Sequence, residues 1–337
     1  MKKFSGLLLM GATLMSLVSC NKKTPEFFTI KNNSNLEVTF SDYGASIYSI
    51  YYEGLCVTYQ PEDHEDFINT NKSSGKILGR TCGRICDGKM TIDGKKYQFD
   101  INEHGTNTLH GGKDGLSHKT FTHEIKENAD DKKIIFSYTS PDGESGYPGT
   151  VDFKITYTIP NNSANIKIDM LGTPRTNDKT PICLSNHTYW RLGGVHGIRD
   201  HELKIPADNI ANSRLNDQII EPGLIKVKGA TDWHKALDFT SFKEIGKDIE
   251  TVAANDPVAA GYDHGWIFNK QIGNNDELPN KVEMQNKVTN VHLTVSTDID
   301  MVFIYANGHP LKDTEMLVYG EDELYGGVSI EPMTYLN

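Results

Sequence analysis

A histidine set among strand-forming residues is the first candidate for chemistry. Residues Thr180–Leu192, TPICLSNHTYWRL, combine Ile, Leu, Thr, Tyr and Trp, and a Gly-Gly pair follows them. This composition predicts a single β-strand. His187 then fits either an imidazole presented into a polar cleft or a structural histidine inside a sheet. Side chains alternate along a strand, so the face shared with His187 is predicted to hold Cys183, Ser185 and Tyr189.

Four further segments present charged or titratable side chains from Gly-rich loops or strand ends. Taken alone, each of these residues fits an ordinary turn or solvated face. Together they supply Arg, His, Asp and Glu from separated positions, which is how sites on β-scaffolds are assembled. The segments are Gly79–Gly88 with two arginines, Asn102–Gly112 with His110, Gly261–Trp266 with Asp263 and His264, and Gly326–Pro332 with Glu331.

The elements that must position these residues are predicted to be short strands. Most apolar–polar alternating runs cover five to nine residues and end at Gly, Pro, Asn or Asp turns. Thr240–Val252 is the only modest helix candidate. The pattern predicts an all-β fold, a large antiparallel sandwich or barrel in one domain. The runs after Phe27 include Phe28–Lys31, Leu36–Phe40, Ile47–Tyr52, Lys89–Phe99, Thr120–Ile125, Lys133–Thr139, Val151–Ile159, Ala164–Leu171, Val282–Met284, Val291–Ser296 and Met301–Tyr305.

The first twenty residues have the layout of an export signal. Lys2 and Lys3 precede the short apolar run Phe4–Val18, and small residues lead to Cys20. The Leu-Val-Ser-Cys ending resembles a bacterial lipoprotein box, which implies cleavage before Cys20 and acylation of its thiol. An ordinary signal peptide with an incidental Cys20 is the alternative. We therefore expect a signal peptide over 1–19, a lipid-anchored tether over 20–27 and a folded domain over 28–337, in a periplasmic or cell-envelope location.

Charge and cysteine spacing exclude several classes of partner. The formal net charge is −11, from 34 basic and 45 acidic residues, and no basic patch is visible. Nucleic acid is therefore not an expected partner. Beyond Cys20, the cysteines form neither a CxxC pair nor a set with spaced histidines, so a zinc site is not expected. Buried free thiols are favoured over a Cys82–Cys86 disulfide; the full set is Cys56, Cys82, Cys86 and Cys183.

In their order along the chain, these motifs resemble the aldose 1-epimerases, also called galactose mutarotases. The resemblance runs from about Phe28 to the last residues. It implies a large twisted antiparallel β-sandwich, the galactose mutarotase-like supersandwich, with a sugar-binding cleft that needs no metal or cofactor. The matching motifs are GRTCGRI at Gly79–Ile85, NTLHGG at Asn107–Gly112, SPDGESGYPG at Ser140–Gly149, NHTY at Asn186–Tyr189, GYDH at Gly261–His264 and the late Glu331.

The resemblance also implies roles, position by position. Glu331 matches the general base and His187 the general acid, whereas Arg84, His110 and Asp263 match residues that hold sugar hydroxyls. Interconverting the α and β anomers of galactose or glucose requires removing the C1 hydroxyl proton and giving a proton to the ring oxygen. We expect an ionised carboxylate and an imidazolium for these tasks, because imidazole titrates near neutrality. Tyr189 or Trp190 fits either an apolar platform for the sugar or the core.

Three departures from the family pattern bear on the substrate. Gly83 stands where the family commonly has Asn, so a side-chain contact with the sugar is lost. Gly83→Asn is expected to lower KM for galactose if φ at this position is below zero. Asp298 is the nearest residue to a position where the family often has Gln. Only six residues follow Glu331, fewer than the resemblance leads us to expect.

Two other functions fit the same fold. A sugar-phosphate epimerase-like enzyme would favour additional Arg or Lys at the cleft. A non-catalytic carbohydrate-binding lipoprotein would have no need of both His187 and Glu331. Retention of this pair favours an enzyme acting on free aldohexoses.

Overall fold

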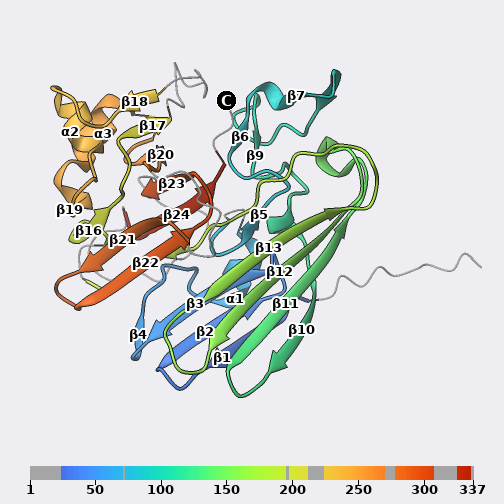
Figure 1. The fold of residues 1–337 in the computed structure, drawn as a ribbon, viewed down its shortest axis with the longest axis horizontal. Helices are drawn as coiled ribbons and strands as arrows, with labels where there is room; N and C mark the ends of the chain where they lie inside the picture. The colour runs from blue at the N-terminus through green and yellow to red at the C-terminus, as the bar shows by residue number, and fades with distance from the viewer. Residues whose placement is uncertain are drawn as a thin grey trace, which may run out of the picture.

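Strands make up most of the regular structure, so the predicted all-β class is confirmed (Figure 1). The computed structural model describes residues 24–70, 73–194, 197–211, 224–257, 259–269, 278–306 and 325–334. The expected signal peptide and Cys20 lie outside the described residues. In the described part of the chain, no helix is long and apolar enough to cross a membrane.

The first half of the chain carries two four-stranded sheets and two short ladders, and one further strand pairs with a strand of the second half. Its single α-helix within the described ranges is α1, His64–Asn69. The strands are β1 Phe27–Lys31, β2 Leu36–Ser41, β3 Ser46–Tyr52, β4 Leu55–Cys56, β5 Ile77–Leu78, β6 Arg84–Ile85, β7 Lys89–Ile92, β8 Lys95–Gln98, β9 Thr108–Leu109, β10 Thr122–Glu127, β11 Asp131–Ser140, β12 Val151–Pro160 and β13 Lys167–Pro174.

The second half carries a six-stranded sheet, ordered β15-β24-β23-β20-β17-β18, and a four-stranded sheet, ordered β19-β16-β21-β22. The helices are α2, Asp232–Leu237, and α3, Ile249–Asn255. The strands are β14 Ser185–Asn186, β15 Tyr189–Trp190, β16 His201–Lys204, β17 Asn209–Ala211, β18 Leu224–Lys226, β19 Lys243–Glu244, β20 Asp263–Ile267, β21 Asn280–Asn286, β22 Val291–Thr297, β23 Met301–Ala306 and β24 Val328–Met333.

The sandwich forms because strand alternation gives each sheet one apolar face. Along β12, buried side chains alternate with partly exposed ones, the pattern of a sheet with one face on the core. Across the layers, the Tyr157 ring of β12 lies 4.9 Å from the Phe40 ring of β2, between ring centroids. The core continues into the second half of the chain through Trp266 and Ile304, and the later strands stand beside the two early sheets in Figure 1.

Two local predictions were wrong. Thr180–Leu192 is not one strand, because β14 pairs with β5 whereas β15 pairs with β24. The chain changes partners between them, at His187. Thr240–Val252 contains β19 and only the start of α3, and the helices α1 and α2 were not predicted. These helices have six residues each, too few to show an apolar stripe in the sequence.

Candidate active site

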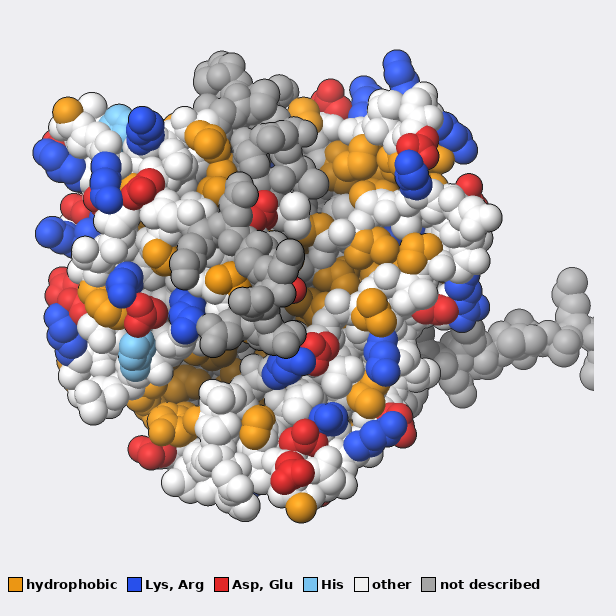
Figure 2. Space-filling model, in the orientation of Figure 1, with side chains coloured by type: hydrophobic (Ala, Val, Ile, Leu, Met, Phe, Trp, Pro, Cys, Tyr) orange, Lys and Arg blue, Asp and Glu red, His pale blue; other side chains and the backbone are white. Residues whose placement is uncertain are grey.

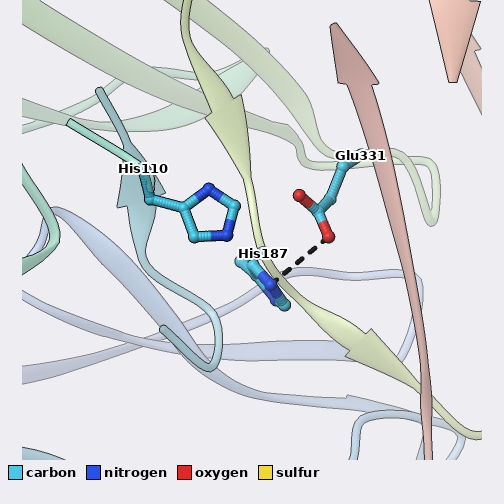
Figure 3. A group of neighbouring side chains, drawn as sticks. All are labelled: His110, His187 and Glu331. Atoms are coloured by element: carbon cyan, nitrogen blue, oxygen red, sulfur yellow. Dashed lines mark ion pairs between the residues drawn. The ribbon is translucent and has the colours of Figure 1, made fainter. Parts of the chain in front are cut away.

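His187 and Glu331 lie together where two elements meet. Glu331 projects from β24, and His187 occupies the irregular link between β14 and β15. The imidazole Nε2 lies 3.3 Å from a carboxylate oxygen of Glu331, and the ring of His110 faces the same space (Figure 3). The exposed fractions of His187 and Glu331 are 6% and 2%. The structure therefore brings together the acid and base that the resemblance assigns.

Burial sets the protonation of this pair. It raises the pKa of Glu331 to about 8, a shift opposed in part by the nearby Arg84 guanidinium. Burial lowers the pKa of His187 to about 4. Both charged forms are disfavoured because neither is well solvated. Near neutral pH the pair therefore consists of a carboxylic acid and a neutral imidazole, not the charged pair expected from sequence. The two states differ by one proton transfer.

Arg84 and His110 are positioned by the β6–β9 ladder. Arg84 pairs with Leu109, so the next residue, His110, emerges beside it. His110 has φ of 52°, and Gly111 follows with φ of 92°. A Cβ at Gly111 would lie 1.8 Å from the carbonyl oxygen of Gly79. Only glycine fits this approach, which gives a physical reason for the glycine that follows His110.

His110 is held neutral with one ring nitrogen available. Its pKa lies well below the usual value because the ring is buried and because His187 and Arg84 are near. The Gly83 amide donates to His110 Nδ1 at 3.3 Å. In the neutral ring Nε2 then carries the proton. His110 can thus donate a hydrogen bond to a sugar oxygen, as the resemblance implies.

The backbone at Gly83 does not have the negative φ on which the expected effect of Gly83→Asn depends. Its φ is +71°, in the left-handed region, whereas the expected gain in affinity required φ below zero. A Cβ here would meet Met333 Sδ at 3.4 Å, an ordinary contact. The cost of a side chain would therefore arise from the backbone conformation, and the gain in galactose affinity is no longer expected.

Arg84 is oriented by two carboxylates. Its Nε donates to Glu103 Oε1 at 2.6 Å, and one of its terminal nitrogens lies 3.7 Å from Asp263 Oδ2. Asp263 begins β20 and is 5% exposed. The site thus contains Arg84, His110 and Asp263, all three residues assigned to the sugar. Glu103 was missed; an acidic residue in the same polar loop as His110 was the available signal.

Arg80, the other arginine of the Gly79–Gly88 segment, has a structural role. It is 2% exposed, and its guanidinium donates to the carbonyl oxygens of Ser140, Pro141, Pro148 and Gly149. Buried carbonyl groups require such partners. Arg80 therefore fixes the SPDGESGYPG segment.

Further residues noted in the sequence lie around or away from this centre. Tyr189 is buried and its ring centroid lies 4.9 Å from that of His187, so it packs beside the acid–base pair. Trp190 packs against the main core. His264 accepts from the Asp263 amide and pairs with Asp256, which supports the start of β20. Asp298 is exposed between β22 and β23.

Three of the site residues also have the donor set of a metal centre. Ligand atoms of His110, His187 and Glu331 all lie within 4.8 Å of one another. Two imidazoles and a carboxylate suit Zn²⁺. The bond from the Gly83 amide opposes such binding, because it keeps the proton on His110 Nε2, the nitrogen left to face an ion.

One face of the molecule carries a group of apolar side chains. Figure 2 shows hydrophobic side chains gathered in an indentation in the middle of the viewed face, with acidic side chains beside it.

Comparisons with known proteins identify the family. The family described as aldose 1-epimerase matches residues 26–335. A galactose mutarotase from Sus scrofa is 32% identical over 208 residues, covering 61% of this chain and 55% of that protein. An aldose 1-epimerase from Escherichia coli K12 is 28% identical over 253 residues, covering 71% of this chain and 67% of that protein. The match thus spans about half the length of the mammalian relative.

Solved structures show the same fold. A galactose 1-epimerase from Lactobacillus acidophilus superposes with a TM-score of 0.76 at 20% identity, covering 92% of this chain and 90% of that one. A GalM/aldose epimerase homologue from C. elegans gives 0.74 at 23% identity with the same coverage. The large antiparallel β-sandwich predicted from the sequence is confirmed.

Proposed function

Because this chain belongs to the aldose 1-epimerase family, we propose that it is an isomerase that interconverts the α and β anomers of free aldohexoses such as galactose and glucose. The observation that carries the proposal is the buried His187–Glu331 pair, 3.3 Å apart, beside an arginine and a carboxylate that can hold hydroxyl groups. A binding protein would need the hydroxyl contacts but not an acid–base pair.

Ring opening uses both members of the pair at once. With the proton on His187, the Glu331 carboxylate removes the C1 hydroxyl proton while the imidazolium protonates the ring oxygen, and the C1–O5 bond breaks. The C1–C2 bond of the open-chain aldehyde then rotates. Closure on the other carbonyl face returns a proton from Glu331 to O1 and passes the O5 proton to His187. Each positioned proton transfer contributes on the order of 10²–10⁴-fold.

The buried environment favours the open-chain step. Ring opening converts the charged pair into a neutral carboxylic acid and a neutral imidazole. This is the state that burial favours, since it raises the pKa of Glu331 and lowers that of His187. From the neutral pair, a proton must first pass from Glu331 to His187 over 3.3 Å. Sugar hydroxyls and Arg84 then stabilise the carboxylate that results.

The charges at the site favour an unphosphorylated sugar. Arg84 is already paired with Glu103 and Asp263, so a phosphate would compete with two carboxylates for the same guanidinium. Hydroxyl groups avoid this conflict, because they accept from Arg84 and His110 and donate to Asp263.

Polarimetry of freshly dissolved α-galactose and α-glucose tests the proposal. Purified protein should speed the approach to equilibrium rotation in proportion to its concentration. Galactose-1-phosphate, which is fixed in the ring form at C1, should act neither as substrate nor as a tight ligand. Binding of galactose without acceleration would establish the carbohydrate-binding alternative instead. Acceleration with galactose-6-phosphate but not galactose would establish the sugar-phosphate alternative.

Chelation separates acid–base catalysis from metal catalysis. Overnight treatment with EDTA should leave the mutarotation rate unchanged, because His187 and Glu331 transfer the protons directly. Added Zn²⁺ should inhibit if it occupies the His110–His187–Glu331 cluster. A rate that falls with EDTA and returns with Zn²⁺ would replace the proposed mechanism by metal-assisted ring opening.

A further inference from the structure

Two cysteine thiols lie against each other next to the site. The Sγ atoms of Cys82 and Cys183 are 3.2 Å apart, although 101 residues separate them in sequence. Their backbones are already joined: the Cys82 amide donates to the Cys183 carbonyl oxygen, and the Cys183 amide donates to that of Arg80, both at 2.8 Å. The segments are thus held in place before any bond forms between the sulfurs.

We propose that Cys82 and Cys183 are a redox modification site that closes to a disulfide under oxidising conditions. A disulfide requires the sulfurs to reach about 2.05 Å, an approach of roughly 1 Å from their present separation. Rotation of the side chains supplies this movement, since the two backbones are hydrogen-bonded neighbours. The bond joins the segment that carries Arg84 to the segment that carries His187.

The two thiols differ in exposure and in pKa, as thiol–disulfide exchange requires. Cys183 is partly exposed, and hydrogen bonding from the Cys82 thiol lowers its pKa to about 6. Cys183 is therefore the thiolate that attacks. Cys82 is buried, and its hydrogen bond to Cys183 together with burial raises its pKa. Once Cys183 is in a mixed disulfide, its thiolate no longer raises the pKa of Cys82.

The oxidant in the proposed exchange is a low-molecular-weight disulfide such as oxidised glutathione. The Cys183 thiolate attacks one glutathione sulfur, and the first glutathione leaves as a thiolate that takes a proton from water. Cys82 sulfur then attacks Cys183 sulfur and releases the second glutathione, with its own proton passing to water. The protein loses two thiols and gains one disulfide, while one glutathione disulfide is reduced to two thiols.

The surroundings suit a structural disulfide. Leu78, Met301 and Met333 pack around Cys82, and a disulfide in this apolar cluster leaves no polar hydrogen to satisfy. Linking residues across such a long loop restricts the unfolded chain strongly. Because the backbones of both segments keep their present places, Arg84 and His187 should keep theirs. The bond should therefore stabilise the fold without closing the site.

The test is peptide mapping of the purified full chain after equilibration with oxidised and reduced glutathione. Digestion without reductant should yield a Cys82–Cys183 linked peptide, and Tm should rise on the order of 5 °C or more over the reduced protein. Cys183→Ser should abolish the linked peptide and the Tm gain. The matched control Cys86→Ser removes an exposed thiol and should retain both.

Free thiols at Cys82 and Cys183 after equilibration with oxidised glutathione would overturn the proposal, as would a Cys82–Cys86 link or mixed disulfides that never resolve. Wild-type protein and Cys86→Ser decide the question even if Cys183→Ser fails to fold. Neither readout uses sugar turnover, so this proposal and the proposed function fail independently.

Discussion

At the scale of single residues, burial shifts the pKa values of the two proposed catalytic groups, an acid and a base, in opposite directions. Glu331 becomes a weaker acid and His187 a weaker base than either would be in water. Because both shifts disfavour charge, they leave one mobile proton on the pair over a broad pH range. Ring opening and closure need such a pair, since each step uses one donor and one acceptor.

Neutral substitutions at the pair should stop the chemistry and keep the fold. Glu331→Gln and His187→Asn should each lower kcat at least about 100-fold, because each removes one proton transfer. Polarimetric rates at saturating galactose measure this effect. Glu244→Gln, on an exposed carboxylate, is the matched control and should leave kcat unchanged. Near-normal turnover by either site variant would remove that residue from its assigned role.

The pKa shifts predict a bell-shaped pH profile. Below about pH 4 both groups are protonated and no base remains, whereas above about pH 8 both are deprotonated and the donor is lost. We therefore expect kcat/KM to be level between these values and to fall about tenfold per pH unit outside them. The spontaneous rate at each pH must be subtracted. A profile with its acidic limb near pH 6.5 would mean that His187 is not desolvated.

At the scale of elements, the short β6–β9 ladder positions residues of the candidate site. It sets Arg84 beside His110, and the loop before β9 contributes Glu103. Glu103 Oε2 also accepts from Asn107 Nδ2 at 3.4 Å, so the loop is tied to the carboxylate that orients Arg84. We interpret Glu103 as a positioning residue for Arg84.

Loss of this orientation should affect binding more than turnover. Arg84→Ala removes charge-assisted hydrogen bonds worth about 1.5–3 kcal/mol, so KM should rise roughly ten- to a hundredfold, and Asp263→Ala should also raise KM. Glu103→Gln keeps the shape of the side chain but removes the negative charge that orients Arg84, so a KM rise of about tenfold with little change in kcat is expected.

Glu127→Gln, on an exposed strand residue, is the matched control for Glu103→Gln. Glu103→Asp tests whether a carboxylate alone restores part of the affinity. A variant Glu103→Gln that unfolds at low temperature but binds galactose normally when folded would show that Glu103 supports the loop rather than Arg84. Unchanged KM for both Arg84→Ala and Asp263→Ala would place the sugar elsewhere.

At the scale of the whole molecule, a proposal for the location of the protein rests on residues outside those that the structure describes. We propose that the chain is an exported bacterial lipoprotein anchored through Cys20, on the evidence of its first twenty residues. A lipid anchor would hold the sandwich at a membrane surface without spanning it. Sugars released outside the cytoplasm would then reach it directly.

Substitution of the anchor residue should separate location from activity. Cys20→Ala should abolish labelling by a fatty-acid analogue and leave an unprocessed or mislocalised precursor, while mutarotation by the folded domain persists. The matched control Cys56→Ala, on a thiol of the folded domain, should be labelled like the wild type. Wild-type protein without label would disprove the lipoprotein proposal.

The sequence by itself determined the fold class and the types of residue at the site. Strand alternation and turn chemistry are local properties, so runs such as Val151–Ile159 could be recognised along the chain. The collinear motifs supplied His187, Glu331 and the three candidate sugar ligands. Local patterns failed where partners change, as within Thr180–Leu192, because strand pairing depends on distant segments.

Only the tertiary structure decided which of these residues act together and in what state. Arg80 and Arg84 look alike in sequence, yet one holds buried carbonyl groups and the other faces the site. The approach of Cys183 to Cys82 rather than Cys86 depends on the contact between two distant segments. The neutral form of the His187–Glu331 pair depends on desolvation. Burial and long-range contacts arise only when the sheets pack, so no local pattern in the sequence specifies them.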